Sequence, residues 1–341
     1  MRIEKNKSLK ELTTFGIGGN AKFFCNIVNE SDIVEAIDFS IKEKVSFFIL
    51  GGGSNILISD EGFQGLVMKM DNKGIEFKEE RNGNVYVKAN AGENWDEFII
   101  ECVNRELYGI ENLSYIPGTI GATPVQNIGA YGSEAKDTIY EVRVYDTKTK
   151  KFYNMKNSDC DFSYRNSIFK KEKRKYIIIS VIFLLSRNRK INISYKDLKE
   201  YLLSKRIKDP TLKEIRNAVI DIRESKLPNT NFIGTAGSFF KNPVINKERA
   251  LELEDKYPGL PIYPTDDINI MKVSLAWIID HVCQYKNKKK GNVGIYKNQA
   301  LAIINEGNAT AHEVLDFADE IKGIVREKTG IDIEMEVEYV L

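Results

Sequence analysis

Two uncharged, glycine-rich segments constrain the fold of this chain more than any other feature. Residues 51–55 read GGGSN and follow the apolar run SFFIL, while residues 116–132 read IPGTIGATPVQNIGAYG. Glycine permits positive φ angles and the close approach of another backbone, so consecutive N–H groups can converge on an anionic group. A tight turn without a ligand remains the alternative for the first segment, and a structural Ω-loop for the second.

A third glycine cluster, GIGGNA at residues 16–21, formally matches the GxGxxG/A dinucleotide fingerprint. That fingerprint requires a preceding strand and a following helix. Here the preceding LKELTT is polar and the following AKFFCNIV has the composition of a strand, so we reject a Rossmann site. A Walker A loop is excluded because the sequence contains no Gly-Lys dipeptide.

The charge balance argues against a polyanionic partner. Fifty Lys and Arg stand against 49 Asp and Glu, a net charge of +1, whereas nucleic-acid binding requires a clustered basic excess. The longest apolar stretch, residues 176–185, is far shorter than the roughly 20 residues of a membrane-spanning helix. The first residues lack the apolar core of a secretory signal. We therefore expect a cytoplasmic globular protein with no nucleic-acid or membrane partner.

The cysteines and histidines do not form a metal site or a disulfide framework. The four cysteines contain no CxxC pair, so reduced, buried thiols are expected. His281 and His312 lie outside any recognisable metal-binding motif. The sequence thus predicts no metal, and proton chemistry that does not use histidine.

Strand and helix patterns are mixed without a regular βαβ order, which favours an α+β fold over a doubly wound sheet. A helix with Ser31 as its N-cap is predicted to extend to Lys44. Further helices are predicted at residues 94–107, 196–204, 211–223, 246–256, 271–285 and 309–328. Residues 331–339 alternate strictly, which predicts a half-buried strand with Glu334, Glu336 and Glu338 on one face. A solvated acidic edge is the alternative for that face.

Eight segments, taken in order, resemble those of the UDP-N-acetylenolpyruvoylglucosamine reductase (MurB) family. They are LTTFGIGGNA, LGGGSN, IPGTIGATPVQNIGAYG, DFSYRNSIFK, RESKLP, AGSFFKNP, KNQAL and EMEVE, and they extend over nearly the whole chain. Members of that family use FAD and NADPH to reduce the enolpyruvyl ether of a UDP-sugar in peptidoglycan precursor synthesis. The resemblance implies the same cofactors and a UDP-sugar substrate. We expect a monomer, although no sequence feature determines the oligomeric state.

The resemblance also implies a domain arrangement. A two-lobed, PCMH-type FAD-binding region is expected to precede a C-terminal α+β substrate-binding domain. The expected parts are residues 1–70 (first lobe), 71–222 (second lobe), 223–328 (substrate domain) and 329–341 (a strand that carries Glu336 back to the active site).

By the same resemblance, FAD contacts are assigned to the two glycine-rich segments and to two arginines. These are Gly51, Gly52, Gly53, Ser54, Asn55, Ile116, Pro117, Gly118, Ala122, Val125, Gln126, Ile128, Gly129, Arg165 and Arg223. The segment KINISYKDLKEYL resembles a loop that clamps the substrate through a tyrosine, which is Tyr195 here. Other substrate or NADPH contacts implied are Lys226, Asn242, Lys272 and Gln299.

Three residues match the family's catalytic set, namely Ser238, Arg165 and Glu336. Hydride addition to the enol ether leaves negative charge on the α carbon and the carboxylate, which the always-ionised Arg165 fork can stabilise. Ser238 can donate the last proton because the carbanion is a very strong base, and Glu336 can share a proton with the carboxylate. Taken singly, Ser238 also fits a loop serine, Arg165 a solvated charge and Glu336 an edge-strand carboxylate.

The sequence departs from the family pattern near Glu336. Met335 and Glu338 stand where the family usually has a proline and an arginine, and Tyr296 replaces a usual histidine. Two rival functions therefore stay open. One is a flavin-dependent oxidase on the same FAD-binding lobes, and the other is a nucleotide-binding module that has lost the chemistry.

Overall fold

The computed structural model describes residues 1–80, 82–188 and 190–341, and the chain divides into two compact units. Unit 1 comprises Met1–Lys7, Ala21–Gly53 and Gln64–Ser225, and unit 2 comprises Ser8–Asn20, Ser54–Phe63 and Lys226–Leu341. Both units contain sheets and helices, which confirms the predicted α+β class. The domain borders expected at residues 70, 222 and 328 stay predictions.

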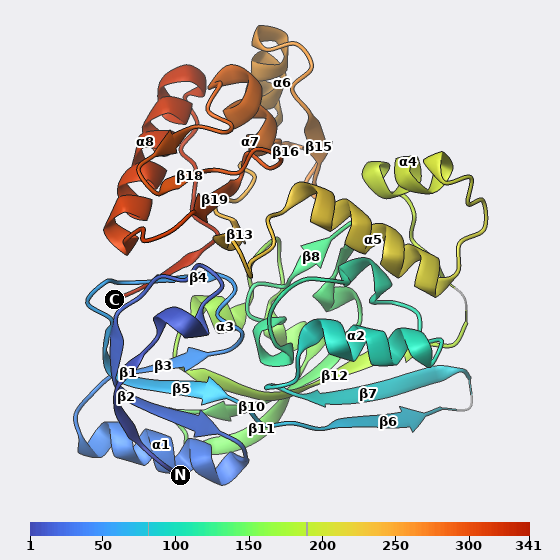
Figure 1. Ribbon diagram of the computed structural model, residues 1–341. Coiled ribbons are helices and arrows are strands. Elements are labelled where there is room, and N and C mark those ends of the chain that lie inside the picture. The colour runs from blue at the N-terminus through green and yellow to red at the C-terminus, as the bar shows by residue number, and fades with distance from the viewer. Residues whose placement is uncertain (81, 189) are drawn as a thin grey trace. The chain divides into compact units, whose positions relative to one another are not determined.

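The first sheet of unit 1 is covered by helix α1 (Glu30–Lys42), as Figure 1 shows. Its strands, in spatial order, are β1 (Glu4–Ser8), β2 (Asn20–Ile27), β5 (Phe63–Met70) and β3 (Phe47–Leu50). The predicted cap Ser31 is wrong, because Asn29 accepts a bond from Asp32 N and Asp32 in turn accepts one from Asn29 N. This reciprocal capping box starts the helix two residues earlier than predicted.

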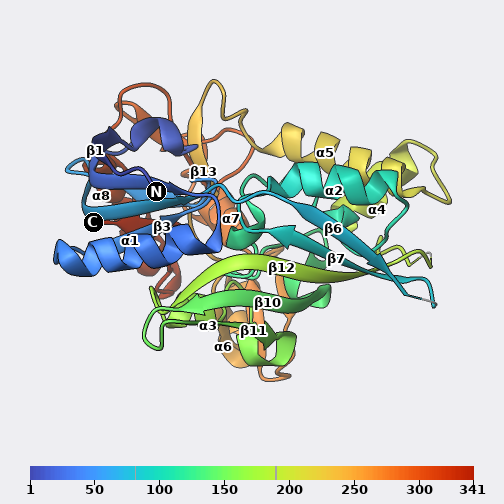
Figure 2. The ribbon, with the colours of Figure 1, turned by 90° about the horizontal axis from the view of Figure 1, so that it is seen from below.

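The second sheet of unit 1 has five antiparallel strands, side by side in Figure 2. In spatial order they are β11 (Lys151–Lys156), β10 (Ile139–Asp146), β12 (Tyr176–Ser186), β7 (Asn84–Asn90) and β6 (Ile75–Glu79). Helix α2 (Trp95–Asn104) packs Trp95 and Phe98 against Phe183 of β12. This aromatic cluster is the centre of a core separate from that of the first sheet.

Two further helices of unit 1 pack on each other. Helix α4 (Lys196–Ser204) has the predicted bounds, and α5 (Leu212–Lys226) extends three residues beyond its prediction. Leu198 and Leu202 of α4 share a small core with Val219 of α5 and with Tyr131, which lies in the second glycine-rich segment. Unit 1 also contains α3 (Ile168–Lys171), the two-residue strands β8 (Gly129–Ala130) and β9 (Ser133–Glu134), and short 3-10 turns at Glu111–Leu113, Ile120–Ala122, Ala135–Asp137 and Asn157–Cys160.

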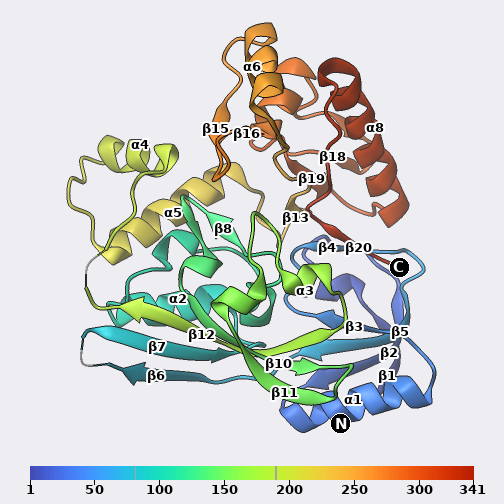
Figure 3. The ribbon, with the colours of Figure 1, turned by 180° about the vertical axis from the view of Figure 1, so that it is seen from behind.

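Unit 2 is built on a four-stranded sheet covered by helix α8 (Ala311–Thr329), seen from behind in Figure 3. In spatial order its strands are β13 (Gly234–Ser238), β19 (Ala302–Asn305), β18 (Val293–Ile295) and β17 (Lys289–Lys290). A second sheet has β14 (Val244–Asn246), β16 (Ile270–Val273) and β15 (Ile262–Pro264), next to α6 (Lys247–Lys256). Phe239, Phe240 and Phe317 lie in the common core.

Two segments from the start of the chain also pack in unit 2. β4 (Ile56–Ile58) pairs in parallel with β20 (Glu338–Val340), and a 3-10 turn occupies Lys10–Leu12. Residues 16–20 lie tightly on residues 58–62, since a Cβ on Gly19 would lie 2.3 Å from Asp60 O. The cluster continues into strand β2 rather than a helix, which confirms the rejection of a Rossmann site.

Two predicted elements differ from the structure. The helix expected at residues 271–285 is instead the end of β16, a single turn α7 (Leu275–Trp277) and a π-helical turn (Ile278–Val282). In the terminal segment Ile331, Ile333 and Val337 are buried as the alternation predicts, yet only Glu338–Val340 pairs as a strand. The alternation of apolar residues indicates which side chains are buried. It does not indicate whether the backbone finds a partner strand.

The Asp60 carboxylate anchors the start of α8, since it accepts bonds from Ala311 N (2.8 Å) and His312 N (3.1 Å). A negative charge at a helix N-terminus is stabilising. We predict that Asp60→Ala lowers the free energy of unfolding by about 1 kcal/mol, the usual effect of losing a cap, as measured by urea denaturation. Asp316→Ala, which removes an exposed acidic side chain of the same helix, is the control and should stay within about 0.5 kcal/mol. Equal losses would contradict the anchoring role.

Candidate functional site

Residues 51–53 of the first glycine-rich segment pack backbone against backbone with the second segment in unit 1. A Cβ on Gly52 would lie 2.7 Å from Gly118 Cα, and one on Gly51 would lie 2.8 Å from Thr119 Oγ1. Gly53 (φ +64°) and Gly118 (φ +136°) both have positive φ, which glycine adopts without strain. The two backbones therefore lie closer together than residues with a Cβ at these positions would permit.

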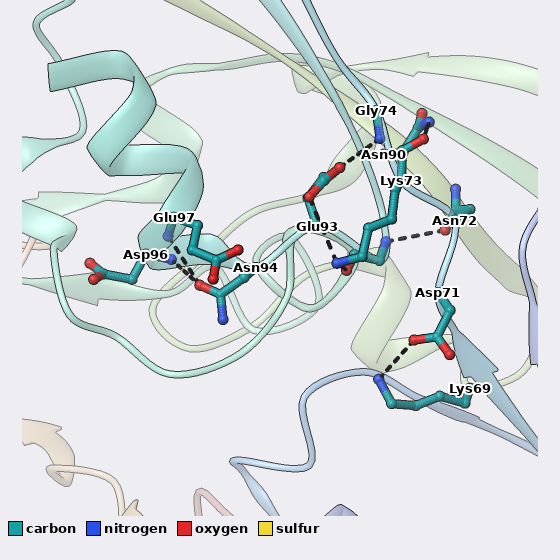
Figure 4. Close-up of polar contacts among 11 residues, drawn as sticks. Lys69, Asp71, Asn72, Lys73, Gly74, Asn90, Glu93, Asn94, Asp96 and Glu97 are labelled. Carbon is teal, nitrogen blue, oxygen red and sulfur yellow. Dashed lines mark hydrogen bonds and ion pairs between the residues drawn. The ribbon is translucent and has the colours of Figure 1, made fainter. Parts of the chain in front are cut away.

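The second segment continues as a short backbone ladder along residues 91–95, which lead into α2. Ile120 N donates to Glu93 O (2.9 Å), Gly121 N to Ala91 O (2.9 Å) and Trp95 N to Gly118 O (3.1 Å). Figure 4 shows the neighbouring side chains, with Glu93 accepting a bond from Gly74 N and Asn94 capping the first turn of α2. The position of the segment is thus determined by the start of this helix.

The Thr119 hydroxyl is the polar group that most clearly indicates a ligand here. Its side chain is only 7% exposed, and Oγ1 has no hydrogen-bond partner among the residues that the structure describes. A buried hydroxyl without a partner costs roughly 1–3 kcal/mol. A polar ligand group held between the two segments would remove that cost. The sequence analysis did not single out Thr119, although a lone hydroxyl between Gly118 and Ile120 was the available signal.

The remaining half of the second segment is held by side chains of the segment DFSYRNSIFK. Ser167 Oγ donates to Val125 O (2.6 Å), and Arg165 Nη2 donates to Gly129 O (2.8 Å). The fully buried Asn127 has φ +44°, and its amide donates to Ser163 O (3.2 Å). The predicted FAD-binding residues from Ile116 to Gly129 therefore lie in one loop whose carbonyls contact the predicted catalytic Arg165.

Arg223 and Tyr195 both lie next to Tyr131 in unit 1. Arg223 Nε donates to Tyr115 O (3.1 Å), and the buried Tyr131 beside it has a raised pKa because of desolvation. Burial lowers the pKa of Arg223, and the neighbouring Tyr131 opposes that shift. Tyr195 is the N-cap residue of α4, 42% exposed, with its ring edge-on to Tyr131 at 5.3 Å between centroids. Arg223, a predicted cofactor contact, and Tyr195, a predicted substrate contact, thus share Tyr131 as a neighbour.

In unit 2 the structure brings Ser238 and Glu336 onto adjacent backbone segments. Ser238 is the last residue of β13 and pairs with Ala302. The carbonyl oxygen of the next residue, Phe239, accepts a hydrogen bond from Glu336 N (2.8 Å). Asn55 Nδ2 donates to Glu336 O (3.2 Å), so a predicted FAD contact lies beside this pair. Ser54 belongs to the same unit, whereas Arg165 belongs to unit 1.

The remaining predicted substrate residues are also in unit 2. Lys272 lies on β16 opposite Tyr263 of β15, with Nζ 5.7 Å from the centre of that ring. Tyr263 is 45% exposed and was not singled out in the sequence. Asn242 Oδ1 accepts a bond from Leu275 N (3.0 Å), Gln299 Oε1 accepts one from Leu301 N (3.3 Å), and Lys226 is the last residue of α5.

The cysteines and the possible metal ligands do not add a further site. All four cysteines are buried, and desolvation raises the pKa of Cys25 and Cys160 to about 12. The described residues hold no group of three His, Cys, Asp or Glu side chains able to bind a metal ion. Over the same residues, no helix is long and apolar enough to cross a membrane.

Comparisons with known proteins agree with this geometry. A family model described as "UDP-N-acetylenolpyruvoylglucosamine reductase, C-terminal domain" matches residues 228–340, and one described as "FAD binding domain" matches residues 21–150. The reductase of that name from Flavobacterium johnsoniae is 42% identical over 342 residues, covering 100% of both chains. The one from Neisseria meningitidis serogroup A is 40% identical over 338 residues, covering 98% of this chain and 96% of its own.

A solved structure shares the fold. The crystal structure of UDP-N-acetylenolpyruvylglucosamine reductase (MurB) from Thermus caldophilus covers 100% of both chains with a TM-score of 0.69 and 22% sequence identity. At that identity the likeness concerns the fold.

Gly52→Ala tests whether the close contact forms the binding site. Because the added Cβ would meet the backbone at Gly118, we expect a loss of about 1–3 kcal/mol in stability, together with purified protein that lacks the FAD absorbance bands. Gly323→Ala is the control, since Gly323 lies in α8 with open space around its Cβ position and should gain about 0.5–1 kcal/mol. Normal FAD content in Gly52→Ala would contradict the assignment.

Proposed function

This chain belongs to the family of UDP-N-acetylenolpyruvoylglucosamine reductases, and on that premise we propose that it reduces the enolpyruvyl ether of UDP-N-acetylglucosamine enolpyruvate to UDP-N-acetylmuramate. NADPH is the reductant, and the reaction has two halves at one site. NADPH would bind in the first half and the UDP-sugar in the second. The enzyme acts as a cytoplasmic monomer in peptidoglycan precursor synthesis.

The residues of unit 1 fit FAD. The partnerless Thr119 hydroxyl offers a donor and an acceptor to a polar group such as the cofactor diphosphate, and the glycines permit close backbone approach. The FAD contacts in this proposal are those predicted at residues 51–55 and 116–129, with Arg223. When bound, FAD supplies the hydride for the substrate.

One observation carries the proposed chemistry, namely the hydrogen bond from Glu336 N to Phe239 O. It joins the backbone segments that carry Ser238 and Glu336, although 98 positions separate the two residues in sequence. On this proposal, the hydroxyl and the carboxylate of these adjacent segments each give or take a proton at one small substrate group. No histidine is required.

We assign the final proton transfer to Ser238, whose Oγ protonates the α carbon after hydride addition. Arg165 stabilises the charge on the substrate carboxylate with its fixed guanidinium fork. Its φ of +53° and its bond to Gly129 O give that fork a defined orientation at the second glycine-rich segment. Glu336 shares a proton with the same carboxylate.

Substrate binding is assigned to Tyr195, Lys226, Asn242, Lys272 and Gln299. Lys272 and the exposed Tyr263 together present a cation beside an aromatic ring, which suits a nucleotide diphosphate and its base. Asn242 and Gln299 also stabilise local backbone, so their substitution should affect both stability and KM.

The curated relatives favour the reductase over a flavin-dependent oxidase or a nucleotide-binding module that has lost the chemistry. Purified protein should show flavin absorbance that bleaches on addition of NADPH and recovers faster with the enolpyruvyl substrate than with oxygen. Stopped-flow absorbance measures both rates. Faster recovery with oxygen would support the oxidase, and protein that cannot be reconstituted with FAD would overturn the proposal.

Ser238→Ala should separate the two half-reactions. Flavin reduction by NADPH should be nearly normal, whereas reoxidation by substrate should slow by roughly 10²–10⁴-fold, the contribution of one proton-transfer group. Ser59→Ala, which changes a buried serine of the same unit, is the control. Equal slowing of both half-reactions would contradict the assigned role.

Glu336→Gln should also slow reoxidation selectively, because glutamine keeps the size of the side chain but cannot carry the proton. The matched control is Glu334→Gln, two residues away, whose carboxylate pairs with Lys241 Nζ at 2.8 Å. Single-turnover kinetics measure both variants. A wild-type rate in Glu336→Gln would return this residue to the solvated acidic edge that its sequence pattern also fits.

A further inference from the structure

The residue that leads into the second glycine-rich segment is held in an unfavourable backbone conformation. Tyr115 has φ +61°, in the left-handed region, where the Cβ of an L-residue is sterically strained. Side chains hold both of its backbone polar groups. Tyr115 N donates to Asp96 Oδ1 (2.5 Å), and Tyr115 O accepts from Arg223 Nε (3.1 Å). Such a conformation persists only where its surroundings stabilise it.

Asp96 is itself held by a second arginine. Arg216 Nη1 and Nη2 donate to the two carboxylate oxygens of Asp96, each at 2.7 Å. The two side chains are only 11% and 22% exposed, so water screens this bidentate pair weakly. Asp96 also lies in the first turn of α2, where a negative charge is favourable, and its carboxylate points away from Lys73 and Glu93 in Figure 4.

Helix α5 supplies both arginines. Arg216 and Arg223 are seven residues apart, about two helical turns, so they lie on one face. A third residue of α5, Glu224, hydrogen-bonds the Tyr115 hydroxyl and raises its pKa. The apolar side of α5 packs on Tyr131, near the other end of the glycine-rich segment. One helix therefore contacts both ends of that segment.

We propose that the Arg216–Asp96 pair is a positioning element that sets the entry of the 116–132 segment and thereby the affinity for FAD. Asp96 connects three elements, namely the first turn of α2, the α5 face and the left-handed Tyr115. This inference rests on the assignment of the segment as the FAD site. Arg216 and Asp96 act on the cofactor through Tyr115 and are not catalytic.

A purely structural ion pair would affect stability without affecting the cofactor. A positioning pair must alter FAD binding, because release of Asp96 permits Tyr115 to leave the left-handed region and the following Ile116–Thr119 backbone to move with it. Arg216→Lys keeps the charge but cannot form two parallel bonds, so its effect should be intermediate.

The test measures the rate of FAD release from full-length holoenzyme after dilution, by the rise in flavin fluorescence. Arg216→Met and Asp96→Asn should each release FAD at least tenfold faster than wild type. The double variant should be no faster than the faster single variant, because both substitutions break one interaction. Should Arg216→Met not fold, Arg216→Lys takes its place, with an expected acceleration of at least threefold.

The matched control is Arg143→Met. Arg143 also forms a two-bond pair with a carboxylate of the same unit, Glu30, with Nε to Oε1 at 2.6 Å and Nη2 to Oε2 at 3.2 Å. This pair is more exposed, at 36% and 40%, and it connects β10 to α1. Its FAD release should stay within twofold of wild type. Equal acceleration in Arg143→Met would make the effect one of general stability and overturn the proposal.

Gly52→Ala separates failure of this inference from failure of the site. Loss of FAD in Gly52→Ala, together with unchanged release in Arg216→Met and Asp96→Asn, would overturn the positioning role alone. Retention of FAD at the wild-type rate in Gly52→Ala would overturn the assignment of the site, and this inference with it.

Discussion

The close approach of Gly52 to Gly118 is the contact on which the FAD-binding unit depends. A side chain on Gly52 would overlap the backbone at Gly118, so the two segments can lie together only without one. The approach also encloses Thr119, whose hydroxyl is left without a protein partner among the described residues. The positions at which the two segments pack are therefore next to the hydroxyl that is available to a cofactor. The residues that permit the contact also leave the polar group that a cofactor can satisfy.

The second glycine-rich segment is held by side chains from three separate parts of unit 1. Asp96 at the start of α2 and Arg223 on α5 hold its entry, and Arg165 and Ser167 hold carbonyls further along. A loop of this length loses much conformational entropy when it becomes ordered. Distributed hydrogen bonds offset that loss and explain how an irregular segment can present a fixed surface.

Unit 2 depends on pairings that are distant in sequence. β20 pairs with β4, Asp60 accepts bonds from the first N–H groups of α8, and Phe239 O accepts the bond from Glu336 N. These contacts place a serine and a carboxylate on adjacent segments, which suits proton transfer without histidine. They also explain why a short N-terminal segment such as Ser54–Phe63 packs with the C-terminal part of the chain.

Local patterns predicted the elements whose formation depends on neighbouring residues. The bounds of α4 were predicted correctly, and α2, α6 and α8 begin within two residues of their predictions, because apolar spacing and capping act over a single turn. The prediction failed where a distant partner decides. Residues 271–273 were expected to be helical but pair with β14 and β15. Ser31 was chosen as a cap where Asn29 and Asp32 cap each other.

By itself, the sequence determined the α+β class, the two glycine-rich segments and the residue types available for chemistry, because these depend on composition, periodicity and motif order. Tertiary structure alone decided that Thr119 is buried without a partner, that Arg216 and Asp96 hold Tyr115, and that Glu336 lies beside Phe239. Each of these contacts joins residues whose partners are set by chain topology, and no local pattern records which distant group will satisfy a buried donor or acceptor.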